Sequence, residues 1–227
     1  MKKVFQKIFS LFKKADPSRK KNRRKTLGQS LVEFAITLPI LLTLMTAVVE
    51  YGFMLNYYLS LVDASRDTAR KFSGGEPFTR DADGNRTGDV PDFYLAAAQW
   101  AERILDPQIM EPAYQGRRIP LDPTKDDVVV TVYSIQDNIA TQYPDTGPYH
   151  LHPAAGFASA FNATSIKDKR LVPAGGEYPP NEGLLLVEVH YNYHQVLKIV
   201  FFTMFGDPVP LNVYTIMPIR AAEPATN

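Results

Sequence analysis

One carboxylate stands where charged side chains are rarely found, near the start of a long apolar segment. Glu33 is the fifth residue after Gly28, and residues 34–49 that follow carry no charge. A carboxylate near the start of a membrane helix costs roughly a few kcal/mol unless it is paired or protonated. If the chain is cut after Gly28, a new ammonium group forms at Gln29, about one helical turn from Glu33. We therefore predict that this amine, on the same subunit or a neighbour, pairs with the carboxylate and sets the axial register between packed helices.

A simpler interpretation of the same residues is a plain membrane anchor. A glutamate near a helix N-terminus is favoured by the helix dipole, whether or not the chain is processed. Pro39, about ten residues into the segment, removes a backbone donor and is expected to bend the helix near the carbonyl of Ala35. Because membrane helices accept proline more readily than soluble ones do, Pro39 fits either interpretation.

The apolar segment is long enough to cross a bilayer once. Adding Leu31, Val32 and residues 51–55 to the uncharged stretch gives roughly the 20 residues that a spanning helix needs. Lysines and arginines flank it only on the N-terminal side, which predicts a cytoplasmic N-terminus and an extracytoplasmic head. A secretory signal peptide would end in a small-residue cleavage site. Here the apolar helix continues towards Phe72 without such a site, so we expect the anchor to be retained in the lipid bilayer.

Charge is divided sharply along the chain, although its net charge is only +1. Residues 1–27 hold 11 of the 25 Lys and Arg and one acid, Asp16, which leaves 14 basic against 23 acidic residues beyond them. Within the basic part, the pattern from Lys2 to Lys14 predicts an amphipathic helix on an anionic membrane surface, with a soluble packing helix as the alternative. Its aromatic residues all lie on that one pattern, which favours a membrane over nucleic acid. The chain has no cysteine, which excludes disulfides and thiolate chemistry.

Three stretches of the sequence resemble a known family. Residues 28–42 read GQSLVEFAITLPILL, residues 63–70 read DASRDTAR, and the run from Leu184 to Glu223 contains VEVHYNY, FFTMFG and NVYTIMPIRAAEP. The first stretch resembles the N-terminal signature of type IV prepilins and, more narrowly, that of the TadE-like family of minor pilins, or pseudopilins, of the tight-adherence (Flp) pilus system. The other two resemble the end of the first helix and the final strands of that family. Residues 72–180 carry no such resemblance.

The resemblance implies an assembly role and not a reaction. Family members are cut by an inner-membrane prepilin peptidase and act with other pilins and pilus assembly proteins. It implies processing between Gly28 and Gln29, and assembly through Glu33, Phe34 and Pro39. We accordingly predict a cleaved basic leader over residues 1–28, a pilin-like transmembrane helix over 29–72 and an extracytoplasmic head over 73–227, in the bacterial inner membrane.

The head is predicted to have an α+β fold with an antiparallel sheet of about three strands. A helix is expected over Asp92–Leu105, between two prolines. Strands are expected over 127–135, 184–193 and 209–220, with a polar loop after Phe72 and a long irregular excursion over residues 136–182. Residues 195–205 are apolar and predict a short helix packed on the sheet or dipping into the membrane interface.

Oxygen-bearing side chains alternate in the polar loop as they do in calcium loops. The candidate ligands are Asp81, Asp83, Asn85, Thr87 and Asp92. Arg86 occupies the position where an EF-hand needs glycine, and a solvated turn explains the same composition. We therefore predict at most a weak calcium site.

The four histidines suggest no metal centre. His150 and His152 lie in a predicted loop with no carboxylate near them in the sequence, and His190 and His194 lack the glutamate of a zinc-protease motif. No nucleophile elbow, P-loop or dinucleotide fingerprint is present. The sequence thus predicts no enzyme and no cofactor. The alternative to a pilin-like protein is a membrane-anchored extracellular recognition domain, which calcium would stabilise.

Overall fold

The computed structural model describes residues 23–137, 139–169, 181–198 and 206–224. By its internal contacts the chain divides into two compact units, residues 1–48 and residues 49–227, which are treated in turn. The amphipathic helix predicted for residues 2–14 lies outside the described residues. The second unit, called the head below, includes the last part of the long helix, residues 49–72.

The N-terminal unit consists of the first part of α2 (Arg23–Phe72), a helix of 50 residues. It begins five residues before Gly28, where the sequence predicted a start directly after the glycine, because residues 23–27 are helix formers without Gly or Pro. Its part from Gly28 to Phe72 is long and apolar enough to cross a membrane. The helix continues on both sides of Pro39, whose carbonyl accepts a hydrogen bond from Thr43 Oγ1 at 2.8 Å.

The head is built on an antiparallel sheet of five strands, not about three as predicted. The three long strands were expected and lie side by side: β3 (Asp127–Gln136), β6 (Asn181–Tyr193) and β7 (Val209–Pro218). The other two, β4 (Ile139–Tyr143) and β5 (Tyr149–His150), both pair with β3 and come from the stretch predicted to be irregular. A separate hairpin of β1 (Phe78–Arg80) and β2 (Arg86–Asp89) occupies the predicted polar loop. These four strands are short, so they carry little apolar alternation.

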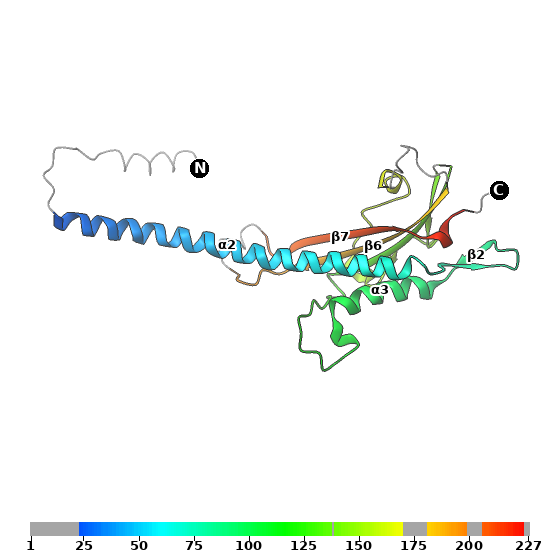
Figure 1. Cartoon of the computed structure of the whole chain (residues 1–227), viewed down its shortest axis with the longest axis horizontal. Helices are drawn as coiled ribbons and strands as arrows, with labels where there is room; N and C mark the ends of the chain where they lie inside the picture. Colours follow the sequence, from blue (N-terminus) through cyan, green and yellow to red (C-terminus); the bar gives the residue numbers. More distant parts are fainter. Residues whose placement is uncertain (1–22, 138, 170–180, 199–205, 225–227) are drawn as a thin grey trace. The chain divides into compact units, whose positions relative to one another are not determined.

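One face of the sheet packs against helices (Figure 1). The helix predicted after Val90 is α3 (Pro91–Leu105), which buries a row of small and aromatic side chains against this face. Alternate residues of the long strands form the rest of this core, among them Val128, Val130, Val187 and Val189. The period of 2 in the strands and 3.6 in the helix brings both apolar faces together.

The end of α2 also lies on this face, and its small residues permit a close approach. Ala64, Ser65, Thr68 and Ala69 are buried, whereas the charged residues between them are exposed. Ser65 Oγ lies 2.8 Å from Thr215 Oγ1 of β7. The stretch DASRDTAR is therefore a packing surface on one side and a charged surface on the other.

The opposite face of the sheet is covered by the chain between β5 and β6. Phe161 and Ile166 pack there on Tyr133, Leu184 and Leu186. This covering segment includes two short 3-10 helices, η2 (Pro153–Ala155) and η3 (Ile166–Lys169). The predicted excursion is therefore ordered structure over residues 139–169, while residues 170–180 lie outside the described part.

Two further turns complete the head. η1 (Pro107–Ile109) follows α3, and η4 (Arg220–Ala222) follows β7, which ends at Pro218 and so earlier than predicted. A Cβ on Gly183 would lie 2.1 Å from the carbonyl oxygen of Ile219, so only glycine lets η4 fold back onto β6. Of the short helix predicted over 195–205, residues 195–198 are not helical and 199–205 lie outside the described residues.

Candidate functional site

The predicted processing and pairing residues share one face of α2. Gly28, Gln29 and Glu33 line a shallow apolar hollow in the N-terminal unit together with Val32 and Ile36. This follows from helical spacing, since residues three and four apart lie above one another. Gln29 Nε2 donates a hydrogen bond to Glu33 Oε1 at 3.1 Å. The side chain of Gln29 therefore already reaches the carboxylate, and a free amine on the same residue would arise within the same turn.

Glu33 is exposed, and no cation pairs with it among the side chains that the structure describes. Its neighbour Phe34 is 63% exposed, and Pro39 is exposed as well. A Cβ placed on Gly28 would meet no atom within 4 Å. Gln29 is exposed too, so all five residues named for processing and assembly are open to a bilayer, an enzyme or a second helix.

A second carboxylate of α2, Glu50, is held in the head and directly follows the uncharged stretch of residues 34–49. Glu50 is 9% exposed and accepts three hydrogen bonds. Tyr193 Oη donates to Oε1 at 2.6 Å, the Val196 amide donates to Oε1 at 2.9 Å, and the Leu197 amide donates to Oε2 at 2.9 Å. The ring of Tyr57, one and a half to two turns further along α2, packs edge-on against Tyr193 at 5.2 Å. This contact fastens the end of β6 to the long helix.

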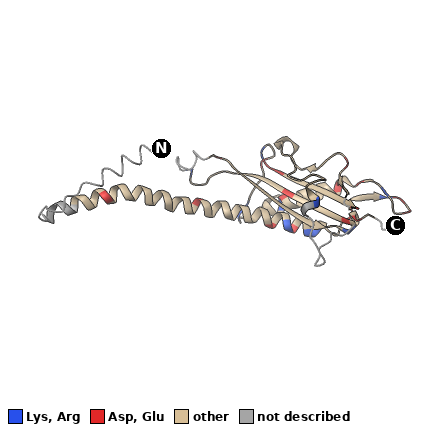
Figure 2. Ribbon diagram, turned by 90° about the horizontal axis from the view of Figure 1, so that it is seen from above, with Lys and Arg blue, Asp and Glu red and all other residues tan. Residues whose placement is uncertain are grey.

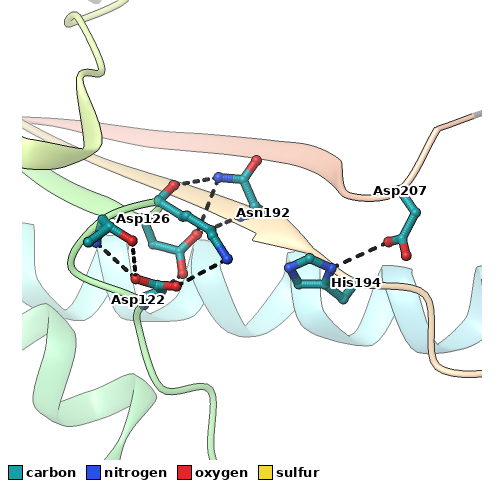
Figure 3. A network of polar contacts seen from close by, with 7 residues as sticks. Asp122, Asp126, Asn192, His194 and Asp207 are labelled. Carbon is teal, nitrogen blue, oxygen red and sulfur yellow. Dashed lines mark hydrogen bonds and ion pairs between the residues drawn. The ribbon is translucent and has the colours of Figure 1, made fainter.

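The strand ends beside this contact are fixed by a network of polar groups (Figure 3). Asp126 accepts hydrogen bonds from the Asn192 and Asp122 amides, both at 2.8 Å, which joins the start of β3 to the end of β6. His194 Nδ1 lies 3.5 Å from Asp207 Oδ1, which joins the end of β6 to the approach to β7. The network holds in place the backbone that supplies the amides to Glu50.

We expect loss of the Tyr193 hydroxyl to loosen the head measurably. Tyr193→Phe should lower the free energy of unfolding by about 1.5–3 kcal/mol, the usual worth of a hydrogen bond to a charged group. Glu50→Ala should cost more, because it also leaves two amides without an acceptor. Unfolding of the full chain in detergent, followed by near-ultraviolet circular dichroism, measures both. Tyr51→Phe is the control, since Tyr51 is 60% exposed. Equal stability of the Tyr193→Phe and Tyr51→Phe variants would contradict the assignment.

A buried polar cluster lies on the face of the sheet away from the helices. Asp127 is fully buried and pairs with His150 Nδ1 at 2.7 Å, while its second oxygen accepts the His152 amide at 2.8 Å. The sequence placed His150 and His152 far from any carboxylate. This was wrong in space, because antiparallel pairing of β3 with β5 brings them to Asp127.

Glu188 and His190 continue the cluster on β6. Glu188 is 1% exposed and accepts hydrogen bonds from the Ser159 hydroxyl and the Ala160 amide. Burial raises the pKa of Glu188 above its ordinary value, although these donors and the nearby His190 and His150 act in the opposite direction. His190 Nδ1 lies 2.9 Å from Asn212 Oδ1, and its ring stacks on Phe157 at 4.7 Å. The cluster therefore ties the covering segment to the sheet.

The raised pKa of Glu188 predicts how the stability of the head changes with pH. The carboxyl of Glu188 holds its proton more tightly in the folded head than in the unfolded chain. Protonation therefore stabilises the fold fully below about pH 4.5, and this contribution is lost as the pH rises through the pKa of the folded state. Glu188→Gln does not titrate. Its melting temperature, relative to the unaltered chain, should therefore increase as the pH is raised from 4.5 towards neutral. Thermal unfolding of the full chain at a series of pH values measures the difference, with the exposed Glu111→Gln as control. A difference that is constant with pH, or that falls, would refute the direction.

The candidate calcium ligands are distributed over three elements. Asp81, Asp83 and Asn85 lie in the turn between β1 and β2, Thr87 lies in β2, and Asp92 lies in the first turn of α3. Asp81 Oδ1 accepts the amides of Asp83 and Asn85 at 3.0 and 2.8 Å. Hydrogen bonds from the side chain and amide of Asn85 lower the pKa of Asp81.

Asp81 thus closes a hairpin turn, in which Gly84 takes a positive φ of 84°. In the described part of the chain no three His, Cys, Asp or Glu side chains group so that they could hold a metal ion. The expectation of at most a weak calcium site stays a prediction.

Comparison with protein families identifies the long helix. Residues 28–70 match the family model described as TadE-like protein. The match confirms the resemblance that the sequence suggested, and it covers Gly28, Glu33, Pro39 and the packing stretch DASRDTAR. It does not extend to the C-terminal strands. No curated protein and no solved structure matches the chain significantly.

The match supports a coarse functional statement. It suggests a pilin-like protein associated with a pilus, and the long apolar helix is consistent with a single-pass membrane anchor. The structure adds that residues 49–72, about the second half of α2, belong to the head and contribute Leu61, Ala64 and Ala69 to its core.

Proposed function

We propose that the protein is a minor pilin, or pseudopilin, that acts in the biogenesis of a tight-adherence-type pilus. The observation that carries this proposal is the TadE-like match over residues 28–70, on a helix of membrane-spanning length with an exposed glutamate near its start. The protein stands in the inner membrane with its basic leader in the cytoplasm and its head outside. Its partners are a prepilin peptidase, other pilins and pilus assembly proteins, and it performs no catalysis and uses no cofactor.

The two carboxylates of α2 support a division of roles within this proposal. Glu50 is occupied by three donors of its own head, so it is committed to the fold. Glu33 accepts one bond from a neutral amide and lies exposed. An exposed carboxylate in apolar surroundings attracts a cation strongly, and the amine created by processing is such a cation. Pairing of Glu33 with the amine of a neighbouring subunit therefore sets the axial register between the two helices.

Processing after Gly28 is the first test. The mature chain from native membranes should begin at Gln29, which mass spectrometry of the N-terminus reads directly. A Gly28→Phe variant should remain at precursor length, because a bulky side chain changes the residue next to the cut bond. Since Gly28 is surrounded by open space, this substitution does not disturb the helix itself. Recovery of residues 1–27 on the functional, mature protein would overturn the proposal.

The role of Glu33 is tested separately from processing. Glu33→Val should leave cleavage and membrane insertion intact and abolish assembly or piliation, because the register-setting charge is gone. Glu33→Asp should retain part of the activity, since the charge persists on a shorter side chain. Piliation is counted by electron microscopy, and processing is followed on the same cells by the change in chain length. Normal piliation of the Glu33→Val variant would show that the residue only favours the start of the helix.

A further inference from the structure

A groove of about 640 Å³ lies against α2 where the helix enters the head. Val49, Gly52 and Phe53 of α2 form one side, and Arg117 and Val196 of the head form another. Its lining is mostly apolar, with Asn56 and a single cationic side chain, Arg117, as the polar exceptions. A mostly apolar groove with one cation is complementary to a molecule with an apolar tail and an anionic head.

The surroundings of the groove place it at a bilayer surface. Apolar and aromatic side chains are exposed at the same level of the molecule. They include Tyr51, Leu55 and Tyr58 on the other side of α2, and Val196 (51%) and Leu197 (40%) after β6. About 20 residues of helix cross a bilayer, so a span that begins near Leu31 ends close to residues 50–55. The groove therefore lies at the outer boundary of the hydrocarbon layer, where tyrosines are enriched in membrane proteins.

The cation at the end of the groove is Arg117, which also lines a neighbouring hollow with Asp63 but does not form an ion pair with it. Arg117 is exposed, and its guanidinium lies 4.7 Å from the centre of the Tyr57 ring. No carboxylate forms an ion pair with it in the part of the chain that the structure describes. The adjacent Arg118 differs, because both oxygens of Asp106 bind it at 2.7 and 2.6 Å. Arg117 thus keeps its planar set of N–H donors for an anion, and phosphate suits that geometry.

We propose that this groove binds one anionic phospholipid of the outer leaflet, with its phosphate on Arg117 and an acyl chain beside Gly52. The inference rests on the membrane orientation in the proposed function and goes beyond it by naming a ligand. A lipid held here would fix the depth of the head relative to the bilayer, at the level where Glu50 fastens α2 to the end of β6.

Lipid retention by the purified full chain tests the site. The chain is stripped of lipid in mild detergent and titrated with phosphatidylglycerol or with phosphatidylcholine, and bound lipids are counted by native mass spectrometry. One phosphatidylglycerol per chain should bind more tightly than phosphatidylcholine. Arg117→Gln should weaken phosphatidylglycerol binding by about tenfold, as expected when a charge-assisted contact is lost. It should weaken phosphatidylcholine binding less, because the choline of that lipid already neutralises its phosphate.

Gly52→Leu tests the apolar part of the groove without endangering the fold. A Cβ on Gly52 meets no atom within 4 Å, and leucine favours a helix more than glycine does. This variant should lose both lipids. Arg220→Gln is the matched control, because Arg220 is an exposed arginine beyond the opposite end of β7 and should bind as the unaltered chain does.

Three outcomes would overturn the inference. Unchanged phosphatidylglycerol binding by Arg117→Gln would remove the headgroup contact. Displacement of the lipid by inorganic phosphate at a matched concentration would show a phosphate site without an acyl groove. Unchanged lipid binding by Gly52→Leu with altered self-association would assign the groove to a second copy of the chain. Each result is independent of processing at Gly28 and of piliation, so failure here leaves the proposed function standing.

Discussion

The long helix α2 has to be stable in two different surroundings, apolar along its first half and those of a folded domain in its last turns. The rest of the structure depends on this constraint. In its first half, large apolar side chains are exposed on all sides of α2, among them Leu31, Ile36, Leu41 and Met45. A helix that is apolar all round is suited to lipid or to packing among other helices. In its last turns the buried residues are small and the charged residues between them are exposed, as in a surface helix of a soluble domain. Figure 2 shows that charged residues gather in this part of the helix. No break separates the two regimes, so the head is joined to the anchor by continuous helix.

Glu50 stands at the change between these regimes. A carboxylate there would be costly in lipid and would be weakly held in water. The end of β6 and the residues after it supply a hydroxyl and two amides, which donate hydrogen bonds to the carboxylate of Glu50 inside the protein. The same contact orders the chain that leaves β6, because the amides of Val196 and Leu197 have no strand partner there. Glu50 thus fixes one end of the contact between the sheet and the helix, and the packed small residues with Ser65 and Thr215 fix the other.

The sequence was sufficient to predict the elements whose apolar pattern repeats over many consecutive residues. α2, α3 and the three long strands have such a pattern, and each was predicted near its observed position. β4 and β5 were not predicted because, with five and two residues respectively, they are too short to show an alternating pattern. They are strands because they hydrogen-bond to β3. Glu33 could be singled out from its neighbours in the chain, and its role in assembly stays a prediction. The partners of Glu50 and Asp127 were not predictable, since they lie 143 and 23 residues away along the chain.

The spacing of Glu33 and Glu50 along α2 can be compared with the thickness of a bilayer. Seventeen residues separate Glu33 from Glu50 in the sequence, and that length of α-helix rises about 25 Å, close to the thickness of a hydrocarbon core of about 30 Å. Each carboxylate is therefore suited to one of the two interfaces of a bilayer. Glu33 has a neutral hydrogen-bond donor and lies exposed, whereas Glu50 is saturated by the head. An unsatisfied charge close to an apolar layer favours the nearest cation, and a saturated one does not. In the orientation proposed above, subunit contacts that depend on charge should consequently form at the cytoplasmic end of the helix, where Glu33 lies, and not at Glu50.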